Sequence, residues 1–132
     1  MIAGPIASIL NPPNLFETAM KLSAIPFCTT DWNTVEPTRH PGDSGFALWR
    51  TQHFGDAANP VRVRIVEYSA GYLADHWCEK GHVLFCLEGE LHTRLADGRS
   101  FILKPGMSYQ VADNAEAHQS ATPIGAKLFI VD

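Results

Sequence analysis

The chain has 132 residues, of which 45% are apolar and 18% charged, a composition that suits one folded domain and excludes a disordered segment. Its formal net charge of −4 argues against a nucleic-acid partner, because binding to phosphates requires a surplus of lysine and arginine. No apolar run approaches the roughly 20 residues of a membrane-spanning helix, so we expect no membrane partner.

The three cysteines are an odd number and lack the spacing of a disulfide framework. Free thiols persist in reducing compartments, so we expect a cytoplasmic protein.

The first part of the chain differs from the rest. Asn11-Pro12-Pro13-Asn14 interrupts regular structure, so residues 1–20 are predicted to be an N-terminal arm or extension and residues 21–132 the folded domain. Two interpretations of the first segment stay open. It is either an extension that reflects the choice of start site, since Met20 is a usable start, or an arm that packs on a neighbouring subunit.

From about residue 44 the sequence predicts short strands separated by turns. Segments 46–54 and 61–69 are rich in aromatic and β-branched residues and are joined by a hairpin loop at 55–60. Asp97-Gly98 is the strongest hairpin signal in the chain. The further predicted strands are 72–78, 82–87, 91–95, 100–103, 108–111, 117–121 and 127–131. Eight or nine short strands at this spacing predict an all-β domain, a small antiparallel β-barrel or jelly roll.

A group of histidines and one cysteine supplies the candidate metal ligands. Because side chains alternate along a strand, Tyr72, His76 and Cys78 are predicted to share one face of their strand. If that strand forms a hairpin with the next one, His76 and Cys78 lie opposite His82, within about 5 Å. His118 is far away in the sequence, so only the fold can bring it to the same place.

The spacing of these residues resembles a known family. Gly71, His76-Trp77-Cys78, His82 and Gly89 resemble the first motif of the cupin superfamily, which reads Gly, His-x-His, Glu and Gly. The stretch from Gly106 to Ala112-Asp-Asn-Ala-Glu-Ala-His118 resembles the second cupin motif, whose histidine completes a metal site.

Asp75-His76-Trp77-Cys78 also supplies the four residue types that name the small bacterial DHCW-motif cupins. The resemblance covers residues 21–132, and it implies a single-domain cupin that holds one metal ion through His76, Cys78, His82 and His118.

The chain departs from the usual cupin pattern at several positions. Cys78 stands where the second histidine is usual, and His82 stands where glutamate is usual. Ala112 and Asn114 replace the usual proline and glycine, and His118 comes one residue late. The alternative interpretation is therefore that these residues are the remnant of a metal site that no longer binds a metal.

The donor types limit the metal. Imidazoles with a thiolate favour Zn, Fe, Ni or Cu over Mg or Ca, which prefer oxygen ligands. If all four groups bind, the site is closed, as structural or sensory sites usually are. If only the three histidines bind, a position remains open for water, dioxygen or substrate. The sequence does not choose between the two, although a barrel interior favours an open site as a small-molecule pocket.

Other residues are candidates for the surroundings of the metal. Tyr72 and Tyr109 are predicted to line the pocket, and Asp75 to orient an imidazole as a hydrogen-bond acceptor. Arg62 and Arg64 would attract an anionic substrate if their strand turned them inward, but a solvated strand face is the preferred interpretation.

The outer face of the predicted strand 82–87 carries Val83, Phe85 and Leu87. An exposed apolar face of this kind is commonly covered by a second subunit, so a homodimer is expected.

The resemblance suggests a metal-dependent enzyme that acts on a small molecule, with oxygenase chemistry favoured over isomerase or lyase chemistry. The alternative is a non-catalytic cupin that binds or senses a metal or metabolite through the closed site. Whether the chain is an enzyme stays open here, and no catalytic residue is assigned.

Overall fold

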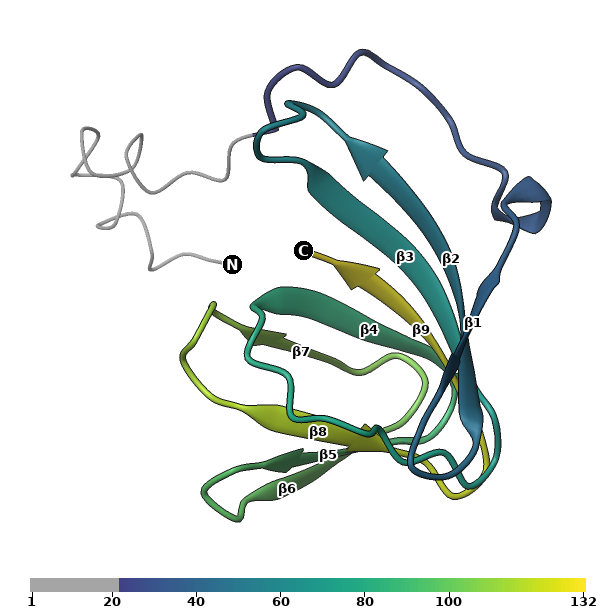
Figure 1. The fold of residues 1–132 in the computed structure, drawn as a ribbon, viewed down its shortest axis with the longest axis vertical. Coiled ribbons are helices and arrows are strands. Elements are labelled where there is room, and N and C mark those ends of the chain that lie inside the picture. The colour runs from purple at the N-terminus through teal and green to yellow at the C-terminus, as the bar shows by residue number, and fades with distance from the viewer. Residues whose placement is uncertain (1–21) are drawn as a thin grey trace, which may run out of the picture.

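The computed structural model describes residues 22–132, and the predicted arm at residues 1–20 lies outside them. Two antiparallel sheets make up this part of the chain, and the larger sheet curves over the smaller one (Figure 1). A short 3-10 helix, η2 (Trp32–Thr34), precedes the first strand. The strands are β1 (Thr38–Pro41), β2 (Phe46–Phe54), β3 (Val61–Tyr68), β4 (His82–Gly89), β5 (Leu91–Leu95), β6 (Ser100–Leu103), β7 (Ser108–Val111), β8 (His118–Ala121) and β9 (Ala126–Val131).

The larger sheet has the order β1-β2-β3-β9-β4-β7, and the smaller one has the order β6-β5-β8. Every ladder within them is antiparallel. Consecutive strands such as β8 and β9 lie in different sheets, and β9 inserts between β3 and β4. This confirms the predicted all-β fold as a jelly roll of two sheets, whose ladders do not close into one continuous barrel.

Most predicted strands are confirmed within one or two residues, because alternating patterns and turn residues mark them clearly. The loop 55–60 joins β2 to β3, and the turn at Asp97-Gly98 joins β5 to β6. Gly98 ends the three-residue loop 96–98 with a φ of 100°, which such hairpin loops need at this position and which glycine adopts without strain. β1 was not predicted, since its four residues, Thr-Arg-His-Pro, have no alternating pattern.

The predicted strand 72–78, and its hairpin with 82–87, are wrong. This segment makes only isolated bridges, from Leu73 to Ser44 and Ala121 and from Cys78 to His118. β4 instead pairs with β7 and β9, which leaves no free edge for such a hairpin. The segment instead runs antiparallel beside β8, joined to it by backbone hydrogen bonds at Ala74 and Cys78, with a bend at Asp75 and His76.

The core lies between the sheets. Alternate residues of β4 and β9, Leu84, Cys86, Leu128 and Ile130, point inward and are at most 3% exposed. Cys86 is fully buried and is therefore a core residue. On the opposite face of β4, the side chains of Val83, Phe85 and Leu87 are 44%, 38% and 38% exposed, as the alternation predicts.

Among the described residues, no helix has the length and apolar character to cross a membrane.

Candidate metal centre

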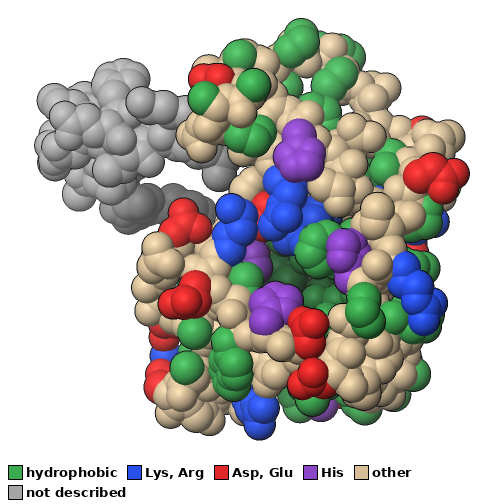
Figure 2. Space-filling view, in the orientation of Figure 1, with side chains coloured by type: hydrophobic (Ala, Val, Ile, Leu, Met, Phe, Trp, Pro, Cys, Tyr) green, Lys and Arg blue, Asp and Glu red, His purple; other side chains and the backbone are tan. Residues whose placement is uncertain are grey.

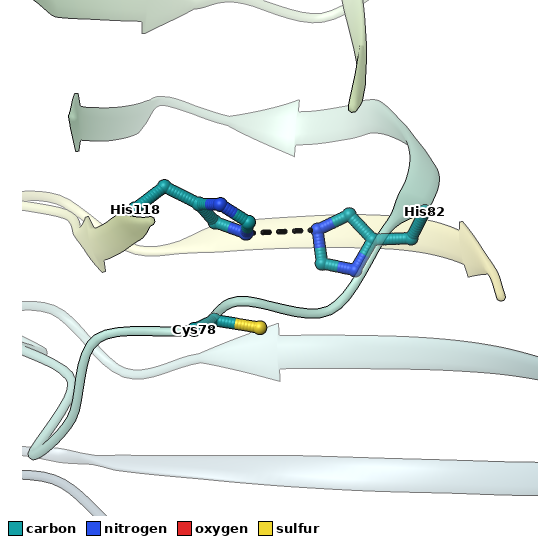
Figure 3. Close-up of side chains that lie close together, drawn as sticks. All are labelled: Cys78, His82 and His118. Carbon is teal, nitrogen blue, oxygen red and sulfur yellow. Dashed lines mark hydrogen bonds between the residues drawn. The ribbon is translucent and has the colours of Figure 1, made fainter. Parts of the chain in front are cut away.

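Three potential metal ligands converge between the sheets. A thiol, Cys78 Sγ, and one ring nitrogen each from His82 and His118 all lie within 4.8 Å of one another. The three side chains point toward one another from different segments of the chain (Figure 3). His118 is 3% exposed, and Cys78 and His82 are partly buried.

Backbone pairing fixes two of these residues against each other. The Cys78 N–H donates to the His118 carbonyl at 2.7 Å, and the His118 N–H donates to the Cys78 carbonyl at 3.0 Å. His82 begins β4 and pairs with Val111 of β7. The segment beside β8 and the strands β4 and β8 therefore hold the three side chains in place without a bound ligand.

The turn before β8 explains how an altered second motif keeps the usual backbone. Asn114 has a φ of 56°, a left-handed conformation in which glycine is usual and asparagine is among the best tolerated other residues. Its N–H donates to the Glu79 carbonyl at 2.8 Å, and Asp113 Oδ1 accepts from the Gly81 N–H at 2.6 Å. These two bonds tie the turn to the residues between Cys78 and His82.

The hydrogen-bond partner of His118 sets its tautomer. Its Nδ1 lies 2.9 Å from the Glu116 carbonyl, which only accepts, so Nδ1 carries the proton and donates. The Nε2 atom, which faces the cluster, therefore has its lone pair free in the neutral ring. Such a carbonyl partner is typical of metal-binding histidines.

His82 is oriented in a similar way by Asp132. The nearest carboxylate oxygen, Asp132 Oδ2, lies 3.6 Å from His82 Nδ1. This distance is too long for a hydrogen bond, and within the described residues the buried Nδ1 has no other partner. The carboxylate favours a proton on Nδ1, so Nε2 is left as an acceptor, and the Tyr109 hydroxyl lies 3.0 Å from it.

These tautomers direct two lone pairs at each other, because the Nε2 atoms of His82 and His118 are only 3.2 Å apart. Such a pair is stable only with a proton or a metal ion between the two nitrogens. A tetrahedral ion with metal–nitrogen bonds of about 2.0–2.1 Å spaces two nitrogens by roughly 3.3 Å. The donor set and its spacing therefore fit a transition-metal ion.

In the absence of a metal, Cys78 and His118 shift each other's pKa through a hydrogen bond. The hydrogen bond with His118 lowers the pKa of Cys78, against the opposing effect of burial. The same bond raises the pKa of His118. Both shifts favour a thiolate beside an imidazolium, and the thiolate is the form of cysteine that binds metals.

A cavity of about 120 Å³ adjoins the three donors. Figure 2 shows it as a hollow, with histidine and basic side chains around it. His76 also lines this cavity, but its side chain is 63% exposed and its Nδ1 lies 2.8 Å from Asp75 Oδ1. The structure thus brings together three of the four predicted ligands and places His76 at the margin.

The predicted pocket residues fall in different places. Tyr72 is buried, lines the cavity and stacks on Tyr68, with ring centroids 4.2 Å apart. Tyr109 lies against both histidine rings. Asp75 is exposed and orients His76 alone.

The preferred interpretation of Arg62 and Arg64 as a solvated face is wrong, since both line the cavity. Their partner is Asp132, whose side chain is 1% exposed. Arg62 donates to it twice, at 2.8 and 2.9 Å, and Arg64 once, at 3.1 Å. Burial alone would raise the pKa of Asp132, but these arginines and His82 outweigh burial and hold it well below its usual range.

Asp132 was missed as a site residue, although the alternation contains the signal. Leu128 and Ile130 are apolar and face inward, so the next alternate position, Asp132, faces inward too. A carboxylate on a buried face requires a charged partner, and the two arginines of β3 supply it.

The sequence matches no protein-family model, and the search of curated proteins found no match. Similar solved structures do exist. An RmlC-like cupin from Shewanella frigidimarina is 19% identical with a TM-score of 0.61, over 82% of this chain and 91% of that one. The polyketide cyclase RemF from Streptomyces resistomycificus is 22% identical with a TM-score of 0.64, over 80% and 78%.

A structure of Fe(II)-HppE with an alternative substrate is 17% identical, with a TM-score of 0.66 over 80% of this chain. The present chain spans 60% of that protein's length. At these identities the likeness establishes the fold, so the chain has the cupin fold.

Proposed function

We propose that this cupin-fold chain binds one transition-metal ion through Cys78, His82 and His118 and acts on a small molecule in the adjoining cavity. One observation carries the proposal. The Nε2 atoms of His82 and His118 face each other at 3.2 Å, and the Cys78 sulfur lies within 4.8 Å of both histidines. Both imidazoles have their other nitrogen directed at a protein oxygen, as metal ligands usually do.

The position of His76 favours an open site. With three ligands from the protein, one position of a four-coordinate ion stays available, which is the arrangement of catalytic sites. A closed site needs His76 to leave Asp75 and turn inward. The open site differs from the one expected from the sequence, because Cys78 takes the place of the third histidine.

The identity of the metal is part of the proposal. Two imidazoles and a thiolate suit Zn, Fe, Ni or Cu. Fe gains support from the Fe(II)-HppE structure, which has the same fold. Bound there, such an ion would supply a Lewis acid or a redox centre. The protein would supply the cavity and the oriented donors.

Oxygenase chemistry is our preferred reaction class over isomerase or lyase chemistry. The second candidate is a non-catalytic module that senses a metal or metabolite. It is favoured by one observation, the reach of His76 into the same cavity, which would permit a closed site of three histidines and one cysteine.

Metal analysis of untagged protein tests the proposal directly. We expect one metal ion per chain in the wild type and a loss of at least tenfold in affinity in Cys78→Ser and His118→Ala. His53→Ala is the matched control, because His53 lies exposed on β2. Folded wild-type protein that takes up no stoichiometric metal contradicts the proposal.

Two further parts of the proposal concern the oligomeric state and the cellular location. The exposed stripe of Val83, Phe85 and Leu87 on β4 supports a homodimer. Cys28, Cys78 and Cys86 are free thiols, which a cytoplasmic location would preserve.

A further inference from the structure

Arg64 is a buried cation beside the metal centre. The residue is only 6% exposed, and it lines the same cavity as Cys78, His82 and His118. Its Nε atom is buried and has no hydrogen-bond partner among the described residues. A buried guanidinium in a cavity wall is stabilised by an anionic partner, and a ligand in the cavity can supply one.

The nearby carboxylate does not satisfy this arginine. Asp132 forms a two-bond pair with Arg62, at 2.8 and 2.9 Å, and gives Arg64 a single contact at 3.1 Å. Two guanidinium groups and one carboxylate leave a surplus of one positive charge. Arg64 is the less exposed of the two arginines, and it has the weaker pairing with Asp132.

Aromatic packing orients the Arg64 guanidinium. Its Cζ atom lies over the Trp49 ring, 4.6 Å from the centroid, and Trp49 is held by stacking on His40 at 3.8 Å. When the flat face of a guanidinium packs on an aromatic ring, its N–H groups point outward along the edge. They remain available for hydrogen bonds.

We propose that Arg64 binds the carboxylate of a small substrate whose remainder lies toward the metal centre. The inference rests on the proposed function for the direction in which the substrate lies. The recognition itself depends only on Arg64 and its surroundings.

Three features select this substrate class. A carboxylate matches the planar fork of a guanidinium with two parallel hydrogen bonds. Asp132 gives two of its three hydrogen bonds with the arginines to Arg62, which leaves N–H groups of Arg64 for a second carboxylate. The cavity volume of about 120 Å³ is well below the roughly 300–1,000 Å³ of sites for larger ligands, so the substrate has only a few carbon atoms.

The Arg64 side-chain N–H can be observed directly by NMR. We suggest titrating ¹⁵N-labelled full-length protein, metal-free and metal-loaded, with acetate, glycolate, acetamide and inorganic phosphate. The Arg64 Nε–H signal is identified by its loss in Arg64→Gln. We expect a saturable shift of this signal with acetate and glycolate, no shift with acetamide, and a weaker response to phosphate.

Variants give the second readout. Arg64→Gln should weaken carboxylate binding by about tenfold or more, because a charged hydrogen-bond pair is lost. Arg64→Lys should keep part of the affinity. Arg50→Gln is the matched control, because Arg50 pairs with Glu67 on the opposite face of the same sheet and should leave binding unchanged.

Several outcomes would overturn the inference. These are equal shifts with acetate and acetamide, tighter binding of phosphate than of carboxylates, and unchanged affinity in a folded Arg64→Gln. If that variant does not fold, the comparison of acetate with acetamide on the wild type still decides. Carboxylate binding at Arg64 in protein that takes up no metal would support this inference and reject the metal centre. Stoichiometric metal binding without a response at Arg64 would support the metal centre and reject this inference.

Discussion

The Nε2 atoms of His82 and His118 lie 3.2 Å apart although 36 residues separate them in the chain. His82 begins a strand of the larger sheet and His118 begins a strand of the smaller sheet. The contact therefore joins the two layers of the jelly roll. The Glu116 carbonyl and the Asp132 carboxylate lie behind the two rings and direct both toward the same point.

Removing His76 should affect the metal less than removing either inner histidine. We expect His76→Ala to keep stoichiometric metal with an affinity within about tenfold of the wild type, and His82→Ala to lose more than tenfold. The reason is that His76 is exposed and bonded to Asp75, outside the cluster of three donors. Competition with a chelator, read by metal analysis, measures both. Equal losses in the two variants would indicate a closed four-ligand site instead.

Asp132→Asn should weaken both the fold and the metal centre. The substitution keeps the shape of the side chain but leaves the buried Arg64 without its anionic partner, which costs about 3 kcal/mol in the free energy of unfolding. The carboxylate behind His82 is also lost, and metal affinity should fall by roughly 10–100-fold. Urea unfolding and chelator competition at pH 7 measure the two effects.

The acid dependence of unfolding provides a check on this assignment. Because the pKa of Asp132 in the folded protein lies below its unfolded value, its stabilising effect is present above the unfolded value and is lost as the pH falls through the folded one. The wild type should therefore lose more stability than Asp132→Asn on acidification. Parallel stability curves for the two proteins would refute the role given to Asp132.

The metal-free protein should contain a thiolate–imidazolium pair. Its Cys78 pKa is lowered and its His118 pKa raised, in both cases chiefly by their mutual hydrogen bond. Ultraviolet absorbance of the thiolate should accordingly titrate below the usual range for cysteine. In Cys78→Ser, the His118 pKa, measured by NMR, should move down toward its ordinary value.

The sign of the linked stability follows from these directions. The raised His118 pKa stabilises the fold below the unfolded value near pH 6.5, and this effect is lost as the pH rises through the folded pKa. The lowered Cys78 pKa stabilises the fold above its unfolded value, and this effect is lost as the pH falls through the folded pKa. A His118 pKa that does not change in Cys78→Ser would exclude the pairing.

A charge on the outer face of β4 should disrupt the proposed dimer. Phe85 is 38% exposed between Val83 and Leu87, and a glutamate there would place a charge in the buried centre of the interface. We expect wild-type protein to sediment as a dimer and Phe85→Glu as a folded monomer. Phe27→Glu is the control, because Phe27 is 95% exposed outside the sheet. A monomeric wild type at all concentrations tested would contradict the dimer.

Local patterns in the sequence determined most of the strands and the two-sided character of β4, because side-chain alternation and turn residues act over a few neighbours. They also determined the types of the metal-binding residues and the spacing between Cys78 and His82. That information is carried by adjacent residues and does not depend on the rest of the fold.

Only the tertiary structure decided which of these residues meet. The predicted hairpin of 72–78 with 82–87 does not form because β7 and β9 occupy both edges of β4, a competition between segments distant in the sequence, and 72–78 lies beside β8 instead. The same long-range pairing brings His118 to Cys78 and places Asp132 between His82 and the two arginines. A buried charge is stable only beside its partner, and in this chain the partners are 68 and 70 residues apart.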